Sequence, residues 1–356
     1  MEFRDATSLR GLLSYSLRHP LESLCSLGPT LNEATFGLLG NSFKPEYDIL
    51  SLEGKVILIT GGETGIGKET ILQLAKHHPA RIYIAARSES KAREAIASIQ
   101  IQLSSPVDIR YISLDLCSFR SIRDAMDQFQ SDCDRLDILI LNAGTMCNPP
   151  TKTEDGIETQ LGTNYIGHFL LTNLLLPTLQ RTVTRIEASG TTPDVRVVTL
   201  GSAAHVMGPA SFEGLTSTSL LLAASTWKRY CASKAAIILF TAEFARRNPQ
   251  ILSISVHPGV VNSDLFMHAK ATGFFMKYSL KVVLWFFRNV TTGALNTLWA
   301  ATTNQDNLVN GAYYTPVGFH SHGASFVQDA DIAQKLWDWT EAQFPTLNYT
   351  LCGCSG

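Results

Sequence analysis

Short apolar runs alternate with longer segments of helical period from Lys55 onward, and this alternation limits the possible folds more than any other feature of the chain. The runs are rich in β-branched residues, as expected for strands that helices cover on both faces. Repeated strand–helix units predict an α/β protein with a doubly wound parallel sheet of the Rossmann type. The expected strands are residues 56–60, 81–86, 109–114, 138–141, 195–200, 252–257 and 312–315.

No linker rich in proline, glycine or serine interrupts this series, which predicts a single catalytic domain over residues 51–345. Residues 1–50 form an N-terminal extension and residues 346–356 a C-terminal tail. Leucines recur near helical spacing in the extension, beside several arginines. This pattern fits an amphipathic segment that packs on the domain or, less well because acidic residues accompany it, a mitochondrial presequence.

The balance of residue types excludes several classes of protein. Of the 356 residues, 45% are apolar and 17% are charged, with a net charge of -2, which is typical of a globular protein that binds neither nucleic acid nor acidic lipid. The seven cysteines have neither the spacing of a zinc site nor the density of a disulfide scaffold, so we expect no metal and a reducing, cytoplasmic location. No uninterrupted apolar run approaches the roughly 20 residues of a transmembrane helix.

A glycine-rich turn, TGGETGIGKE, follows the first expected strand and opens the next expected helix. Glycine lets the backbone turn sharply and approach a pyrophosphate, which then lies on the positive N-terminal end of the helix. A glycine turn without a ligand is the alternative, and a Walker motif is excluded because no GK[ST] follows at the required spacing. We therefore expect a dinucleotide to be bound by Gly61, Thr64, Gly65, Ile66 and Gly67.

The second expected strand ends at Ala85-Ala86-Arg87, where an acidic residue would bind a free ribose 2'-hydroxyl. No carboxylate occupies this place. The planar guanidinium of Arg87 can instead pair with a 2'-phosphate, and Lys91 adds positive charge nearby. This feature favours NADP(H) over NAD(H). The alternative is that Arg87 is a solvated charge at the end of a strand.

Tyr230 and Lys234 are four residues apart in a segment of helical period, so both side chains project from one face of a helix. An ammonium near a phenol stabilises the phenolate and lowers its pKa, which makes proton transfer to or from a substrate oxygen accessible at neutral pH. The same spacing is also typical of a solvated helix face, so the surrounding motifs decide between the two interpretations.

Six motifs in chain order resemble those of the short-chain dehydrogenase/reductase family. They are TGGETGIG, LNAG at residues 141–144, Asn164 within GTNYIGHF, Ser202 after the fifth strand, YCASK at 230–234, and HPG at 257–259. The versions GIGKET, HFLLTNLLLP and SVHPGVV are similar to the retinol-dehydrogenase-like and WW-domain-oxidoreductase-like members, and no WW domain is visible. The order and the strand positions match over about 290 residues.

The resemblance implies an oxidoreductase in which Tyr230 is the catalytic acid/base and Lys234 lowers its pKa and holds the nicotinamide ribose. Ser202 would hydrogen-bond the substrate oxygen, and Asn164 would anchor a water-linked proton relay. Further cofactor contacts are implied for Asp115, Leu116, Asn142, Ala143, Gly144, Pro258, Gly259 and Val261.

Some of these residues also have structural interpretations. Asn164 could cap or kink its helix, Ser202 could form a turn at a strand end, and Asp115 could cap the helix that begins near Ser118. The chain also departs from the commonest family pattern, because Leu141 replaces the first asparagine of NNAG and Gly201-Ser202 replaces paired serines. The long interval before Tyr230 is interpreted as a loop at the substrate mouth. It includes two hydroxyl side chains that could compete with Ser202 for the substrate, Ser225 and Thr226.

Aromatic residues crowd the region 261–292, which is the expected substrate loop. Their density predicts a small lipophilic alcohol or carbonyl substrate of retinoid, steroid or polyketide type, including one from secondary metabolism. The region could alternatively pack on the core or on a partner subunit, or touch a membrane surface weakly, so a monomer and a homo-oligomer both stay open. Two further functions remain: a catalytically idle NADP(H)-binding sensor or assembly protein, and epimerisation or dehydration on the same fold.

Overall fold

A computed structural model of the chain describes residues 42–209, 211–259, 261 and 289–344. Within these residues, eight strands form one sheet in the order β3-β2-β1-β4-β5-β6-β7-β8. All neighbours are parallel except β7 and β8, which are antiparallel. The strands are β1 (Val56–Thr60), β2 (Arg81–Ala86), β3 (Ile109–Ser113), β4 (Ile138–Leu141), β5 (Arg196–Leu200), β6 (Leu252–Val256), β7 (Tyr313–Thr315) and β8 (Phe319–Ser321). The doubly wound parallel sheet is therefore confirmed.

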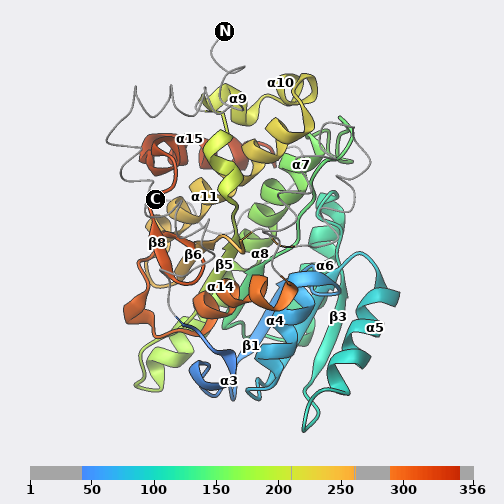
Figure 1. Ribbon diagram of the computed structural model, residues 1–356, viewed down its shortest axis with the longest axis vertical. Helices are drawn as coiled ribbons and strands as arrows, with labels where there is room; N and C mark the ends of the chain where they lie inside the picture. Colours follow the sequence, from blue (N-terminus) through green and yellow to red (C-terminus); the bar gives the residue numbers. More distant parts are fainter. Residues whose placement is uncertain (1–41, 210, 260, 262–288, 345–356) are drawn as a thin grey trace.

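Helices cover both faces of this sheet, as Figure 1 shows. One face is covered by α4 (Gly65–Ala75), α5 (Glu89–Gln100) and α14 (Val290–Thr302). The other is covered by α6 (Phe119–Asp132), α8 (Gly167–Ala188), α11 (Thr226–Arg247) and α15 (Ala330–Glu341). Shorter helices are α3 (Pro45–Asp48), α7 (Thr159–Leu161), α9 (Phe212–Thr216) and α10 (Thr218–Ala223), with the turns η1 (Gly162–Ile166), η2 (Ala203–Met207), η5 (Gln305–Asn307) and η6 (Ser325–Gln328).

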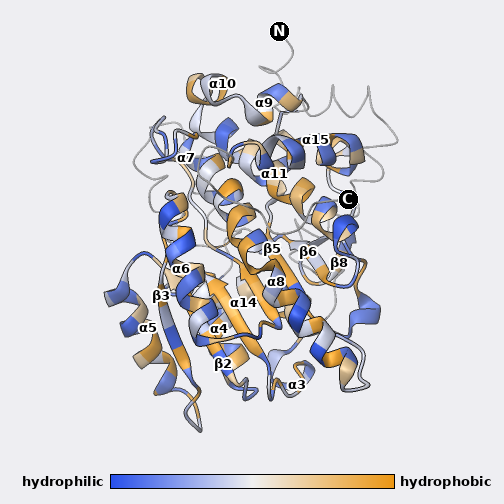
Figure 2. Cartoon of the chain, turned by 180° about the vertical axis from the view of Figure 1, so that it is seen from behind, coloured by the Kyte–Doolittle hydropathy of each residue, from blue (hydrophilic) through white to orange (hydrophobic). Residues whose placement is uncertain are grey.

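Two hydrophobic cores lie on opposite faces of the sheet because successive strand residues point to opposite sides. In β1, Leu58 packs into the core with Phe169 of α8, whereas Ile57 and Ile59 pack into the core with Ile71 of α4. The central strands are buried on both faces, which explains why they read as continuous apolar runs. Figure 2 shows these strands as the most hydrophobic part of the molecule.

The strands expected from the sequence are found within one residue at each end. The structure has one strand that the sequence did not predict, β8. It begins directly after Gly318, a residue with φ of +67°, and pairs with β7. A second correction concerns the interval before Tyr230. It was expected to be a loop, but it folds into η2, α9 and α10. Ser211 and Ser217 cap the last two through their hydroxyls, so the serines that resembled loop residues start helices.

Several expectations fall outside the described residues: those for positions 1–41, for the greater part of the region 261–292, and for the tail 346–356. The described end of the N-terminal extension packs on the domain, because Phe43 and Ile49 are buried in the core that contains α4. Among the helices of the described part, none combines the length and the apolar character needed to cross a membrane.

Candidate active site

The carboxyl ends of β1 and β4 lie side by side at the point where the strand order reverses, and the loops that leave them are held together. The Asn142 side-chain amide donates hydrogen bonds of 2.9 Å to the carbonyls of both Thr60 and Gly61. The Ala143 amide donates to the Thr60 hydroxyl at 3.0 Å. Asn142 and Ala143, expected beside a cofactor, thus fix the glycine turn against the fourth strand.

The turn between β1 and α4 requires glycine at several positions. Gly61 and Gly65 have φ of +66° and +53°, a backbone region that residues with a side chain rarely adopt. A Cβ at Gly67 would lie 2.3 Å from the Gly61 carbonyl oxygen, so glycine is required there. Thr64 precedes the helix, and its side chain makes no capping hydrogen bond. The first amides of α4, which include that of Ile66, are therefore available to a pyrophosphate, and the turn fits a dinucleotide.

The ends of β2 and β3 lie next to this turn. Arg87 is exposed at the end of β2. Burial raises the pKa of the Cys117 thiol, and the charge of Arg87 opposes this rise. Asp115 accepts a 2.9 Å hydrogen bond from the Cys117 amide, whereas Ser118 caps α6. The expected alternative of Asp115 as the helix cap is therefore wrong, although Asp115 does form a local turn. Leu116 is buried beside it.

Tyr230 and Lys234 lie on the buried face of α11 at the carboxyl edge of the sheet, each 6% exposed. The Lys234 Nζ atom lies 5.8 Å from the centroid of the Tyr230 ring and donates a 2.6 Å hydrogen bond to the Leu200 carbonyl. It also lies near Gly144, since a Cβ there would be 3.8 Å from Nζ. The pair is therefore buried in the site, so the alternative of a solvated helix face does not apply.

The electrostatics of this pair follow from its burial. Burial raises the pKa of the Tyr230 phenol to about 12, and a hydrogen bond from the Ser202 hydroxyl opposes that rise. Burial also lowers the pKa of Lys234 to about 8. The sequence led us to expect that Lys234 lowers the pKa of Tyr230. That effect stays a prediction, and in this structure the ammonium donates its hydrogen bond to the Leu200 carbonyl.

Asn164 lies in η1, a π-helical turn that precedes α8, so it does mark a distortion of its helix. Its side chain accepts from the Thr145 amide at 2.7 Å and donates to the Thr145 carbonyl and to the Ser233 hydroxyl, both at 2.9 Å. Ser233 in turn donates to the Tyr230 carbonyl at 2.8 Å. Asn164 therefore connects the loop after β4 to the helix that carries Tyr230.

Ser202 lies two residues after the end of β5 and caps η2, where its hydroxyl accepts from the Ala204 amide at 3.2 Å. It therefore forms a turn and contacts Tyr230 at the same time. The two hydroxyls that could compete with it are engaged elsewhere. Ser225 caps α11 by accepting from the Lys228 amide, and Thr226 donates to the Asn148 carbonyl at 3.0 Å. The structure thus brings Ser202 to Tyr230.

Pro258, Gly259 and Val261 follow β6 at the same edge of the sheet. Gly259 has φ of +82°, and a side chain there would be strained. Val261 is 3% exposed and packs against Gly293 near the start of α14. The three residues thus follow β6, the strand that pairs with β5.

Two buried histidines were not singled out from the sequence. The His168 ring lies 3.0 Å from the Thr60 hydroxyl and 3.1 Å from the Asn164 carbonyl, so it joins the glycine turn to η1. The His205 ring lies 2.6 Å from the Ser202 carbonyl. Burial lowers both pKa values to about 4, so both rings are neutral at pH 7. The signal for His168 was its position four residues after Asn164, on the same helical face.

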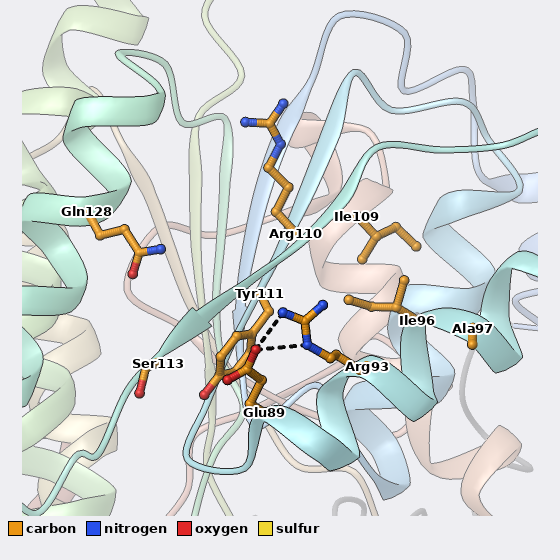
Figure 3. Close-up of a pocket in the computed structure, with 9 residues that line it drawn as sticks. All are labelled: Glu89, Arg93, Ile96, Ala97, Ile109, Arg110, Tyr111, Ser113 and Gln128. Atoms are coloured by element: carbon orange, nitrogen blue, oxygen red, sulfur yellow. Dashed lines mark hydrogen bonds and ion pairs between the residues drawn. The ribbon is translucent and has the colours of Figure 1, made fainter.

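A surface hollow of about 660 Å³ lies along β3, the outermost strand at one end of the sheet (Figure 3). Arg93 in this hollow is paired with Glu89 of the same helix, and Arg110 is paired with Asp108 and Asp132. None of its lining residues belongs to the group around Tyr230. The hollow is therefore separate from the candidate active site.

Comparison with known proteins identifies the family of the chain. The family model for short chain dehydrogenases matches residues 55–212. A short-chain dehydrogenase/reductase of Armillaria gallica is 35% identical, with 84% of this chain and 94% of that protein covered. Human retinol dehydrogenase 12 is 38% identical, with 81% of this chain and 86% of that protein covered.

Solved structures show the same fold. An uncharacterised protein from Mycobacterium paratuberculosis has a TM-score of 0.64 and 28% identity, with 85% of this chain and 97% of that chain covered. A 3-ketoacyl-(acyl-carrier-protein) reductase from Brucella melitensis, in complex with NADH, has a TM-score of 0.55 at 20% identity, with 75% and 98% covered, a likeness that shows the fold alone. With the curated relatives above, these findings show that the chain belongs to the short-chain dehydrogenase/reductase family of oxidoreductases, in its retinol-dehydrogenase-like branch.

Proposed function

We propose that the protein transfers a hydride between NADP(H) and an apolar alcohol or carbonyl compound, with Tyr230 as the catalytic acid/base. The observation that carries this proposal is the convergence of Tyr230, Ser202, Lys234 and Asn164 beside the glycine turn. Hydrogen bonds tie these residues to one another or to the ends of β4 and β5. A group of this composition at the switch point of the sheet is where a dinucleotide enzyme has its chemistry.

The cofactor would be held by the turn between β1 and α4 and by Arg87. The open amides of α4 receive the pyrophosphate, and the exposed guanidinium of Arg87 pairs with the 2'-phosphate. When bound there, NADP(H) supplies or accepts the hydride. The preference for NADP(H) rests on Arg87 and on the lack of a carboxylate in its place. The four cysteines in the described ranges form no disulfide, which supports a cytoplasmic location.

In the reductive direction, the Tyr230 hydroxyl donates its proton to the substrate oxygen. Its pKa of about 12 keeps the phenol protonated at neutral pH, which is the form that a proton donor needs. Ser202 donates a hydrogen bond to the same oxygen, a contact that strengthens as negative charge develops there. Lys234, with a pKa of about 8, is mostly charged at pH 7 and stabilises the phenolate that remains.

Apolar side chains are exposed on α11 beside Tyr230 and on η2, which packs against α11. The Trp227 ring lies 5.7 Å from the Tyr230 ring and is 37% exposed, and Met207 of η2 is 41% exposed. Large apolar groups left open beside a polar reactive atom favour a lipophilic substrate. The relatives named retinol dehydrogenase point the same way. We therefore propose a retinoid-, steroid- or polyketide-like carbonyl or alcohol, of the kind made in secondary metabolism.

The purified protein should be incubated with NADPH or NADH and a panel of retinoid, steroid and long-chain carbonyl compounds. We expect the nicotinamide absorbance to fall faster with NADPH, and the product to carry two additional hydrogens by mass spectrometry. Tight binding of NADPH without turnover of any compound would favour an idle sensor or assembly protein. An altered configuration or a loss of water in the product would favour epimerisation or dehydration.

A further inference from the structure

We propose that Arg229, held by Glu158, is a positioning residue that locks the first turn of α11 onto the loop after β4 and thereby fixes the Tyr230 hydroxyl against Ser202. The proposal rests on the function proposed above, because it assigns Arg229 a role in the same reaction. It is drawn from an ion pair beside Tyr230 that the proposed chemistry does not use.

Arg229 directly precedes Tyr230 and is among the largest fully buried side chains, with 2% exposure. Its guanidinium donates to the Ala224 carbonyl at 2.8 Å and to the Asn148 carbonyl at 2.5 Å. Its Nε atom lies 3.0 Å from the Glu158 carboxylate. One planar group therefore joins three separate segments: the end of α10, the loop after β4, and the start of α7. The shorter, point-like ammonium of lysine cannot match this geometry.

Glu158 is fully buried, and its carboxylate has a second task. The other oxygen accepts from the Leu161 amide at 2.8 Å and so caps α7. Gln160, two residues after Glu158, donates a hydrogen bond to the Thr226 carbonyl at 3.0 Å. The segment that contains α7 therefore contacts the start of α11 at two points, and the two helices pack together (Figures 1 and 2).

The contact at Asn148 closes a ring of hydrogen bonds around Tyr230. The Asn148 side chain accepts from the Thr145 hydroxyl at 2.6 Å, and the Thr145 backbone is held on both sides by Asn164. Asn164 reaches the Tyr230 carbonyl through Ser233. Tyr230 is thus supported on its amino-terminal side by Arg229 and on its carboxyl-terminal side by Asn164, which acts through Ser233. If the first support loosens, the phenol can move away from Ser202 while the nucleotide turn keeps its shape.

The test compares Arg229→Lys with a matched control, Arg196→Lys. Arg196 is also 2% exposed, pairs with Asp194, and donates to two backbone carbonyls, those of Ala300 and Thr303, far from Tyr230. Both substitutions keep the charge and lose the planar fork, and both should lower the melting temperature.

For Arg229→Lys we expect kcat to fall about 10- to 100-fold, the loss typical of a small misplacement of a reacting group, with KM and the NADPH dissociation constant within about threefold of wild type. Arg196→Lys should keep its kcat. The proposal is overturned if Arg229→Lys retains kcat within about twofold, or if Arg196→Lys loses as much as Arg229→Lys.

Hydrogen–deuterium exchange tests the proposal without a substrate. Arg229→Lys should speed exchange in residues 145–148 and 224–231 but not in the turn at 61–67. Unchanged exchange in 145–148 and 224–231 contradicts the proposal. If Arg229→Lys does not fold, Glu158→Gln, which removes the carboxylate charge at nearly equal volume, takes its place with the same expectations. Tyr230→Phe separates the two claims: full activity in that variant refutes the proposed function, whereas an inactive Tyr230→Phe beside a fully active Arg229→Lys refutes the positioning role alone.

Discussion

Alanine at Gly67 would place a methyl group inside the turn that joins β1 to α4. Its Cβ would lie 2.3 Å from the Gly61 carbonyl oxygen and 2.6 Å from the Asn142 side-chain nitrogen. Real contacts of this kind are not shorter than 3.0 Å, so the turn and the helix must separate by about 0.7 Å. Because one of the two atoms belongs to the backbone, a side-chain rotation cannot relieve the contact.

Overpacking of this kind costs about 1–3 kcal/mol, and the better helix propensity of alanine offsets about 1 kcal/mol of that. The free energy of unfolding should therefore fall by about 1 kcal/mol, which for a chain of this size lowers the melting temperature by roughly 2 °C. NADPH binding should be weakened by more than the free energy of unfolding is lowered. The α4 amides move with the helix, and we expect the NADPH dissociation constant to rise about tenfold or more, at least about 1.4 kcal/mol.

Titration of the bound nucleotide's fluorescence measures this constant directly. The control is Gly190→Ala, which follows α8, has φ of +77° and has no neighbour within 4 Å of a Cβ. Its strained backbone should lower stability by about 1–2 kcal/mol while the NADPH affinity stays at the wild-type value. Unchanged affinity in Gly67→Ala would show that the pyrophosphate does not lie on the amino-terminal end of α4.

Three further outcomes are expected. Arg87→Ala should weaken NADPH binding about 10- to 100-fold and leave NADH binding unchanged, since one charge-assisted contact is worth about 1.5–3 kcal/mol; equal losses for both nucleotides in a binding titration would contradict this role. Lys234→Met should abolish turnover yet raise the free energy of unfolding at pH 7 by up to about 3 kcal/mol in urea titrations, because burial lowers the pKa of Lys234 from 10.5 to about 8 and its charge is unfavourable in the fold. Acid should destabilise the protein through three buried histidines: burial lowers the pKa of His168 and His205 to about 4 and that of His257 to about 3, so the unfolded chain binds more protons as pH falls through 6.5. The free energy of unfolding should then drop by as much as about 4 kcal/mol per pH unit near pH 5, and a flat profile in urea titrations between pH 7 and pH 5 would contradict this.

The sheet could be predicted from the sequence because its strands are short, apolar and bounded by turn residues. Val56–Thr60 and Ile138–Leu141 are buried on both faces, so their pattern depends on burial alone and is visible in one dimension. Phe319–Ser321 could not be found this way. It has three residues, mixed burial and an antiparallel neighbour, and its place depends on β7. The helices α9 and α10 were not predicted for a different reason, because serine is common both in loops and at helix caps.

The candidate site was predictable as a set of motifs but not as a set of contacts. Tyr230, Lys234 and Ser202 could be named from their order along the chain. The direction of the Lys234 ammonium toward Leu200 could not, because it depends on how α11 crosses β5. The Arg229–Glu158 pair was equally hidden, since the two residues lie far apart in sequence and match no motif. Motifs record residue identity, whereas hydrogen-bond geometry and pKa values depend on the packed structure.

The role of Tyr230 is tested most directly by the rate of hydride transfer in a single turnover of Tyr230→Phe, measured with saturating NADPH and an active carbonyl substrate. We expect this rate to fall about 100-fold or more, with the NADPH dissociation constant unchanged. Tyr83→Phe is the matched control, because Tyr83 is a buried tyrosine whose hydroxyl donates to Asp132 at the other edge of the sheet. It should keep the wild-type rate. A Tyr230→Phe rate within about threefold of wild type would contradict the assignment of Tyr230 as the proton donor.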